Sequence, residues 1–232
     1  MGSLPVTTAE PGDAARYVAI ITDGNGRWAR ARDLPVGEGH EAGADTVKAR
    51  LRDAVDLGVR ELTVYSFSTE NWSRPEEEVM GLMAMFAQRI VEETPELHEQ
   101  GVRMRFVGRR AGVEEALIEQ MDWAENLTRD NDRITLFVAF NYGGRAEIVD
   151  AARRFTDGDE ADFQALLYAP EMHDPDLIIR TSGERRLSNY LMWQSAYSEL
   201  VFRDELWPDF DRAAFEACLA EFSARRRRFG GR

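Results

Sequence analysis

The stretch YVAIITDGNGRW, residues 17–28, joins a short apolar run to a segment rich in glycine. Residues 17–21 include several β-branched side chains, which is typical of a strand buried on both faces. Gly24 and Gly26 follow at alternate positions, where glycine lets the backbone turn tightly and approach a ligand closely. The stretch therefore predicts a buried strand that ends at a binding loop.

Further short apolar runs indicate five more strands, at residues 61–67, 102–107, 134–140, 176–180 and 200–202. Helical patterns separate them, at residues 41–57, 75–100, 113–128, 144–155 and 212–227. Strands that alternate with helices favour right-handed βαβ units. We therefore expect an α/β fold in which a central, mainly parallel six-stranded sheet is flanked by helices. The run at 102–107 alternates in polarity, which predicts a strand near an edge.

The composition limits the possible partners. The formal net charge of the 232 residues is −13, which argues against nucleic acid as a partner and allows at most peripheral contact with a membrane. Cys218 is the only cysteine, and no apolar run approaches the roughly 20 residues that span a bilayer, so we predict a cytoplasmic protein. Residues 1–16 lack the pattern of a secretory signal and predict a disordered tail before a single domain at 17–232.

The first polar motif follows the first predicted strand. Asp23 offers the hard oxygen ligand that Mg²⁺ prefers. Backbone N–H groups at Gly24, Asn25 and Gly26, together with Arg27, could cradle a diphosphate. The alternative is a plain Gly-Asn-Gly turn with a solvated aspartate and arginine.

Three more motifs also follow predicted strands. Residues 180–189, RTSGERRLSN, hold three arginines in seven positions, which indicates an anion site because guanidinium binds phosphate in a bidentate way. Residues 68–75, STENWSRP, are consistent with ligand contact or with a capped loop around a packed Trp72. Residues 141–145, NYGGR, fit a turn into a helix equally well. Because ligands bind beyond the carboxyl ends of parallel strands, the motifs together predict one site.

Two further features leave alternatives open. His40 lies near the start of a predicted helix and, taken alone, would more often be a surface residue; the spacing of the three histidines argues against a zinc site. The helix at 75–100 carries an apolar face, formed by Val79, Met83, Phe86 and Ile90. This face indicates either ordinary core packing or the wall of a channel for a flexible apolar ligand.

In this order, the motifs resemble those of the cis-prenyltransferase family, which includes undecaprenyl diphosphate synthase. The resemblance rests on DGNGRWA at 23–29, FSTENWSRP at 67–75 and RTSGE at 180–184, with WPDF at 207–210 and RRFGG at 227–231. It covers nearly the whole chain. The paired Asp-Asp-x-x-Asp motifs of trans-acting prenyl synthases are missing from the sequence, which supports the cis class.

The resemblance implies an apolar tunnel, a homodimer, Mg²⁺, and two substrates, isopentenyl diphosphate and an allylic prenyl diphosphate. Asp23 would bind the metal, with help from Glu199, and Ser68 and Asn71 would assist proton removal. The allylic diphosphate would be held by Gly24, Asn25, Gly26, Arg27 and His40, with Trp28 in the same motif. Isopentenyl diphosphate would be held by Arg74, Arg180, Arg186 and Ser188, and positioned by Trp72 and Glu78. Arg228 and Gly230 would reach across the dimer.

The sequence departs from the family pattern at two positions. Thr22 replaces the usual methionine before the first aspartate, and Val36 replaces an arginine that contacts the allylic diphosphate in many members. We expect weaker or altered use of the allylic substrate from the second change. Ser66 leaves room where members of the family tune the tunnel, whereas Phe137 and Phe140 add bulk, and together they favour a medium or long product.

Two other functions compete with a cis-prenyltransferase. A non-catalytic partner subunit of the same fold should have lost the aspartate and the Asn-Trp loop, but this chain keeps Asp23 and Asn71. An α/β enzyme of unrelated chemistry that binds phosphate esters is the second alternative.

Overall fold

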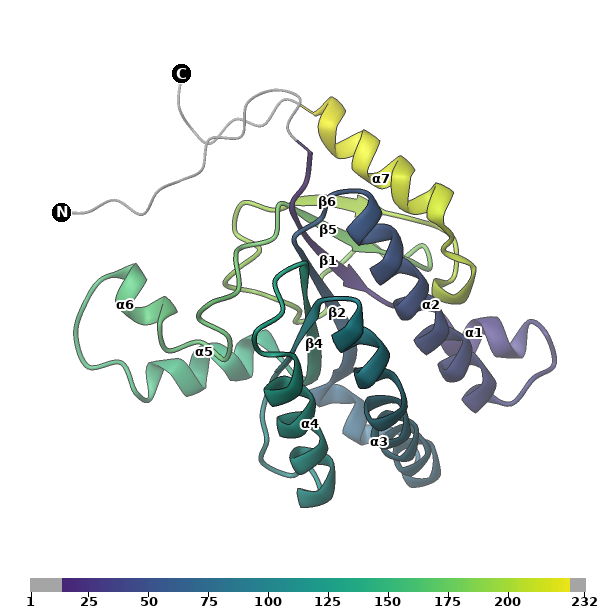
Figure 1. The fold of residues 1–232 in the computed structure, drawn as a ribbon, viewed down its shortest axis with the longest axis horizontal. Coiled ribbons are helices and arrows are strands. Elements are labelled where there is room, and N and C mark those ends of the chain that lie inside the picture. The colour runs from purple at the N-terminus through teal and green to yellow at the C-terminus, as the bar shows by residue number, and fades with distance from the viewer. Residues whose placement is uncertain (1–13, 226–232) are drawn as a thin grey trace.

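Six parallel strands form one sheet in the order β3-β4-β2-β1-β5-β6. The computed structural model describes residues 14–225, and Figure 1 shows their arrangement. The strands are β1 (Tyr17–Ile21), β2 (Glu61–Ser68), β3 (Val102–Val107), β4 (Ile134–Tyr142), β5 (Leu177–Arg180) and β6 (Glu199–Phe202). The predicted strands and the edge position of β3 are confirmed.

The main helices are α1 (Asn25–Arg30), α2 (Val36–Asp56), α3 (Glu76–Glu99), α4 (Glu115–Thr128), α5 (Gly144–Ala152), α6 (Glu160–Gln164) and α7 (Arg212–Ala224). Short 3-10 helices lie at η1 (Thr69–Ser73) and η2 (Trp207–Asp209). The sequence analysis did not predict α1, η1 or α6, and it started α2 five residues too late. Of the last predicted helix, residues 226–227 lie outside the described residues.

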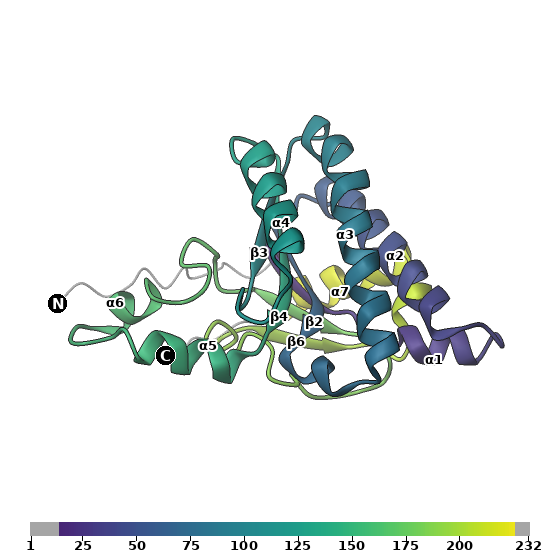
Figure 2. The same ribbon diagram turned by 90° about the horizontal axis from the view of Figure 1, so that it is seen from below.

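Alternate residues of β1 face two different apolar clusters. Val18 and Ile20 pack with α2, α3, α4 and α7, whereas Ala19 and Ile21 face a cluster with Tyr190 and Leu191. In Figures 1 and 2 the four long helices lie on one side of the sheet and α5 and α6 on the other. The period of two along a strand buried on both faces explains why the run appears continuously apolar in the sequence.

The apolar face of α3 belongs to the larger cluster, together with Phe140 of β4. Ordinary core packing is therefore what the structure shows for this face, and the tunnel stays a prediction. Phe137 is different, because it packs in the cluster on the opposite side of the sheet. Of the two phenylalanines expected to add bulk on this strand, only Phe140 therefore lies on the side of α2 and α3.

Within residues 14–225, no helix is both long enough and apolar enough to cross a bilayer. Residues 1–13 of the predicted tail lie outside the described residues, and so do residues 226–232 of the predicted domain.

Candidate active site

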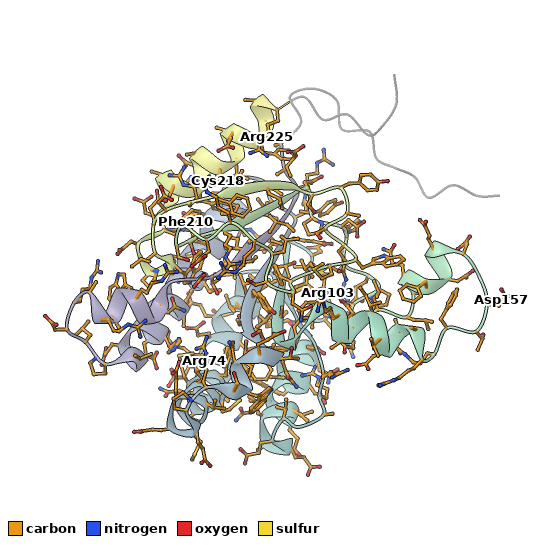
Figure 3. The ribbon with its side chains drawn as sticks, turned by 180° about the vertical axis from the view of Figure 1, so that it is seen from behind. Arg74, Arg103, Asp157, Phe210, Cys218 and Arg225 are labelled. Carbon is orange, nitrogen blue, oxygen red and sulfur yellow. The ribbon has the colours of Figure 1, made fainter. Side chains whose placement is uncertain are left out.

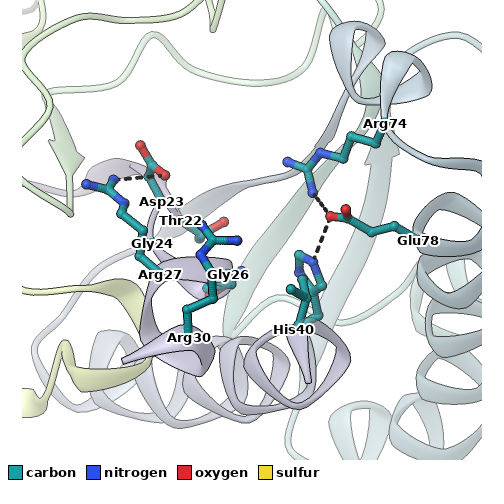
Figure 4. Close-up of a pocket in the computed structure, with 11 residues that line it drawn as sticks. Thr22, Asp23, Gly24, Gly26, Arg27, Arg30, His40, Arg74 and Glu78 are labelled. Carbon is teal, nitrogen blue, oxygen red and sulfur yellow. Dashed lines mark hydrogen bonds and ion pairs between the residues drawn. The ribbon is translucent and has the colours of Figure 1, made fainter. Parts of the chain in front are cut away.

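A polar cavity of about 230 Å³ opens beyond the carboxyl end of β1, between the starts of α2 and α3 (Figure 4). Its lining combines the Gly-rich motif with residues from α2 and α3, namely Thr22, Asp23, Gly24, Asn25, Gly26, Arg27, Arg30, Val36, His40, Arg74 and Glu78. Thr22, just beyond the end of β1, therefore meets His40 and Glu78, which are distant in the sequence, at one edge of the sheet. Ligands of parallel sheets bind at this edge.

Asp23 is fixed from two sides. Its backbone N–H donates to the Thr181 hydroxyl over 3.1 Å, and that hydroxyl donates to the Asp23 carbonyl over 2.7 Å. Its carboxylate accepts from Arg180 Nη2 at 2.9 Å and lies 3.5 Å from Arg27 Nη2. Burial raises the pKa of Asp23, but the hydrogen bond and charge of Arg180 outweigh it, so the pKa is lowered overall. The carboxylate is therefore ionised at neutral pH.

Arg180 joins the first motif to the third. Its side chain is only 5% exposed, and besides Asp23 it donates from Nη1 to the Ser188 hydroxyl at 2.6 Å and to the Arg186 carbonyl at 2.5 Å. A buried guanidinium with its own carboxylate and hydroxyl partners is a preorganised anion site.

The Gly-rich motif is a helix, not an open loop. Gly24 adopts φ 119°, and a Cβ there would come within 3.0 Å of Leu206, so glycine is required at the turn from β1 into α1. α1 then lies so close to α2 that a Cβ on Gly43 would stand 2.6 Å from Asn25 Oδ1. Trp207 of η2 supports the same place by donating from Nε1 to the Gly43 carbonyl at 2.8 Å.

His40, Glu78 and Arg74 close the far side of the cavity. Glu78 Oε1 lies 3.4 Å from His40 Nε2 and accepts from Arg74 Nη1 at 2.9 Å, as Figure 4 shows. Burial lowers the pKa of His40, the nearby charge of Arg74 adds to that effect, and the bond to Glu78 opposes it. His40 is therefore neutral at pH 7, and its single N–H has Glu78 as acceptor, so the ring must turn away from Glu78 before it can donate to an anionic ligand.

Residues 21–230 match the family described as putative undecaprenyl diphosphate synthase. The chain belongs to this family. The prenyltransferase is 52% identical over 230 residues to isoprenyl transferase 2 of Bradyrhizobium diazoefficiens, covering 94% of this chain and 91% of the relative. It is 48% identical over 225 residues to an isoprenyl transferase of Thermotoga maritima, covering 93% and 97%.

Solved structures agree with this assignment. Lavandulyl diphosphate synthase from Lavandula x intermedia, in complex with dimethylallyl diphosphate, matches the prenyltransferase with a TM-score of 0.89 and 34% identity, over 94% of this chain and 99% of that one. A probable undecaprenyl diphosphate synthase from Campylobacter jejuni matches with a TM-score of 0.81 and 28% identity, over 94% and 100%.

The structure does not bring Glu199 of the prenyltransferase to Asp23. Glu199 opens β6 beside Leu177, whereas Asp23 follows Ile21, which pairs with the last residue of β5. Glu199 thus lies at the amino edge of the sheet, about 10 Å before the level of Ile21 at 3.3 Å per residue. Its carboxylate accepts from Arg225 at 2.7 Å, and Figure 3 shows Arg225 at the end of the molecule opposite Arg74. Within one chain Glu199 therefore does not lie beside Asp23, and its predicted role in metal binding stays a prediction.

The side chains of Trp28 and Arg186, which were predicted to bind substrate, do not face the cavity in this structure. Trp28 is not among the lining residues, because its Nε1 donates to Asp209 at 2.7 Å and its ring stacks under Arg32 at 4.3 Å. Arg186 has a side chain that is 60% exposed and pairs with Glu184. Trp28 therefore anchors α1 to η2, and Arg186 would have to turn inward to meet a ligand.

The loop after β2 is tied at both ends. Ser68 N–H donates to Asn71 Oδ1 at 3.0 Å, and Trp72 Nε1 donates to Asn141 Oδ1 at 2.8 Å. Trp72 keeps 39% of its surface exposed while its ring meets Phe67 edge-on at 5.1 Å. The NYGGR motif thus orients Trp72, and the predicted contacts of Ser68, Asn71 and Trp72 with substrate stay predictions. Arg228 and Gly230 lie outside the described residues.

The sequence analysis missed Arg30. Arg30 lines the cavity, and its Nη1 stands 3.5 Å from where a Cβ on Gly26 would be. Its guanidinium forms no hydrogen bond or ion pair with any of residues 14–225. Arg27 and His40 line the same cavity (Figure 4). The signal was the spacing: once α1 is recognised as a helix, positions 26, 27 and 30 share one face.

Proposed function

We propose that this prenyltransferase condenses isopentenyl diphosphate with an allylic prenyl diphosphate and forms a cis double bond. One observation carries the proposal: Asp23 and Arg180, which end neighbouring strands, meet at 2.9 Å beside a cavity lined by further arginines. The names of two similar proteins, isoprenyl transferase 2 and lavandulyl diphosphate synthase, support diphosphate substrates of this class.

The allylic diphosphate would bind in the cavity itself. Arg27, Arg30 and His40 face it from α1 and α2. Arg27 is partly engaged, since its Nη1 donates to the Ser182 carbonyl at 3.1 Å, whereas Arg30 is free to form a charge-assisted bond. We assign Arg30 the contact that Val36 cannot make, because both side chains approach Gly26 at the same wall, at 3.5 and 3.7 Å from its would-be Cβ.

Isopentenyl diphosphate would bind on the other side of Asp23, at Arg180 and Ser188, with Arg186. Arg74, which was also predicted to hold this substrate, lines the cavity itself and would reach the second diphosphate from there. Arg180 and Ser188 already share a hydrogen bond of 2.6 Å, so this half of the site is formed before the ligand arrives. Trp72, held by Asn141, would pack against the five-carbon group.

Asp23 fits a magnesium site in which the phosphate oxygens of the substrate complete the coordination of the ion. No group of three or more His, Cys, Asp or Glu side chains suited to a metal occurs among residues 14–225. Mg²⁺ is commonly bound through one or two carboxylates together with substrate phosphates, and Asp23 supplies one ionised carboxylate at the cavity. When bound there, the ion would neutralise charge on the departing diphosphate.

The reaction breaks the allylic C–O bond, forms a C–C bond to the isopentenyl double bond and releases one proton. Arg27 and Arg30 would stabilise the charge that develops on the leaving diphosphate, in a site preorganised by the sheet, and His40 would join them only after its N–H leaves Glu78. Arg180 would hold the second substrate so that its double bond faces the reacting carbon. Asn71 and Ser68, linked to each other after β2, would direct the proton that leaves.

A radiochemical assay tests the function. Labelled isopentenyl diphosphate is incubated with Mg²⁺ and allylic primers of five, ten or fifteen carbons, and products are sized by chromatography after dephosphorylation. We expect elongation that requires the metal and gives cis double bonds by NMR. Inactivity alone, with activation of a second prenyltransferase chain, would instead support the non-catalytic subunit. The predicted homodimer is tested by light scattering, and cytoplasmic location stays a prediction.

A further inference from the structure

We propose that Arg89 of α3 is a determinant of product length, because its ion pairs hold α3 against α2 where the growing prenyl tail must part them. The inference rests on the proposed function. It concerns residues well outside the cavity, which nothing in the reaction itself requires.

The tail needs more room than the cavity offers. The cavity of about 230 Å³ is lined mostly by polar groups, and sites that bury small organic ligands usually measure about 300–1,000 Å³. It therefore suits a diphosphate head better than a hydrocarbon chain of several isoprene units. The facing sides of α2 and α3 beyond it are apolar, with Val47 and Leu51 on α2 and Leu82, Met83 and Phe86 on α3, all packed in one core cluster.

Ion pairs connect the two helices along their outer rim. α2 and α3 run side by side in Figures 1 and 2, and His40 with Glu78 forms the pair nearest the cavity. At the far end, Glu96 binds Lys48 at 2.5 Å and Arg52 at 2.6 Å. Lys48 is the only lysine of the chain.

Arg89 is the middle and most connected member of this rim. Its Nη2 donates to Glu41 at 2.6 Å and its Nη1 to Asp45 at 2.7 Å, both on α2. Nη1 also donates to Glu93 at 2.9 Å within α3, and the side chain is 24% exposed. A bidentate arginine shared among several carboxylates in a half-buried place has more effect than a single exposed pair.

Each isoprene unit added to the product pushes the tail further between α2 and α3, and the Arg89 ion pairs oppose that separation. Growth ends when the free energy needed to separate α2 from α3 exceeds the free energy gained by burying another isoprene unit. Removal of the ion pairs should therefore lengthen the product without changing how the first diphosphate binds.

The chain offers a matched control for Arg89. Arg212 of α7 also binds two carboxylates on α2, Asp53 at 3.2 Å and Asp56 at 3.0 Å, and one in its own helix, Glu216 at 2.8 Å. It joins α2 to α7 instead of α3. Arg89→Met and Arg212→Met thus each remove one guanidinium that pairs with two carboxylates of α2, but only the first releases α3.

The test compares both variants with the wild type under saturating isopentenyl diphosphate. For Arg89→Met we expect products longer by at least one isoprene unit, kcat/KM of the first condensation within about twofold, and faster amide exchange in α2 and α3 by mass spectrometry. Raising salt to about 0.5 M should lengthen wild-type products by screening the ion pairs and should have no further effect on the Arg89→Met product length. Arg212→Met should keep the wild-type length.

An unchanged product length in Arg89→Met, or an equal shift in Arg212→Met, would overturn the proposal. Should Arg89→Met fail to fold, Glu41→Gln removes the α2 partner instead and carries the same expectation. A wild-type protein that elongates no primer would defeat the proposed function and the claim on length with it. Amide exchange would still show separately whether Arg89 holds the two helices together.

Discussion

The two ends of the sheet use the same residue types in opposite ways. At the amino end two carboxylates have partners within the fold: Glu61 lies 2.7 Å from His173 Nδ1, and Glu199 accepts from Arg225 at 2.7 Å. At the carboxyl end Asp23 serves both Arg27 and Arg180, and Arg30 has no partner among the described residues. Glu199 is thus paired within the fold at the first end, whereas the second end keeps the positive charge of Arg30 for a ligand, although the chain as a whole carries −13.

Replacement of one acidic residue at each end of the sheet should show the difference between the two ends most clearly. Asp23→Asn removes the carboxylate beside the cavity, and we expect kcat to fall by about 10²–10³. Glu199→Gln leaves the Asp23 side untouched, so activity should stay within about twofold. Steady-state kinetics on the two variants, with melting temperatures to confirm folding, provide the measurement. A loss in Glu199→Gln as deep as in Asp23→Asn would restore Glu199 as a metal ligand, contributed from another chain.

Two arginines, one that ends α1 and one that follows it, sharpen the comparison next. Arg30→Met should raise the KM for the allylic diphosphate about ten- to a hundredfold, because a hydrogen bond to a charged group contributes roughly 1.5–3 kcal/mol. Arg32→Met is the control, since Arg32 is two residues away but binds Asp209 and stacks on Trp28. Equal effects in the two variants would show a general loss of α1 stability instead of a lost ligand contact.

An added charge at the same wall should have a smaller effect. Val36→Arg places a second guanidinium beside Arg30, so we expect the allylic KM to fall by at most about threefold, less than an isolated charge-assisted bond would give. The same substitution in the Arg30→Met background should lower KM more strongly. If neither background responds, position 36 does not face the allylic diphosphate.

The smallest effect concerns pH. Because the pKa of His40 is lowered by burial, the unfolded chain binds more protons than the native one as pH falls below about 6.5, and stability decreases. His40→Gln should therefore lose less stability between pH 7.5 and 5.5 than the wild type in urea unfolding, whereas His173→Gln at the amino end serves as the control for removal of a histidine. A steeper pH dependence in His40→Gln would show that the charged form is favoured in the fold.

The sequence was sufficient to place Asp23 and Arg180 together because both follow apolar runs, and ends of parallel strands meet at one edge. It did not reveal α1, a helix of six residues that is supported by contacts distant in sequence, the packing of Asn25 on Gly43 and the bond from Trp28 to Asp209. Without α1 the position of Arg30 was not visible. The place of Glu199 was not visible either: it follows the RTSGE motif closely in sequence, but the chain returns to the opposite edge of the sheet before β6 begins.

The hydroxyl of Thr181 has a consequence for how the protein tolerates heat. It joins the main chain after β1 to the main chain after β5, two strands that are already neighbours in the sheet. The distance between the proposed sites for the two diphosphates is thus set by the backbone hydrogen bonds between β1 and β5. On warming, the reaction geometry should persist for as long as the ladder between these two strands survives, and vanish together with it.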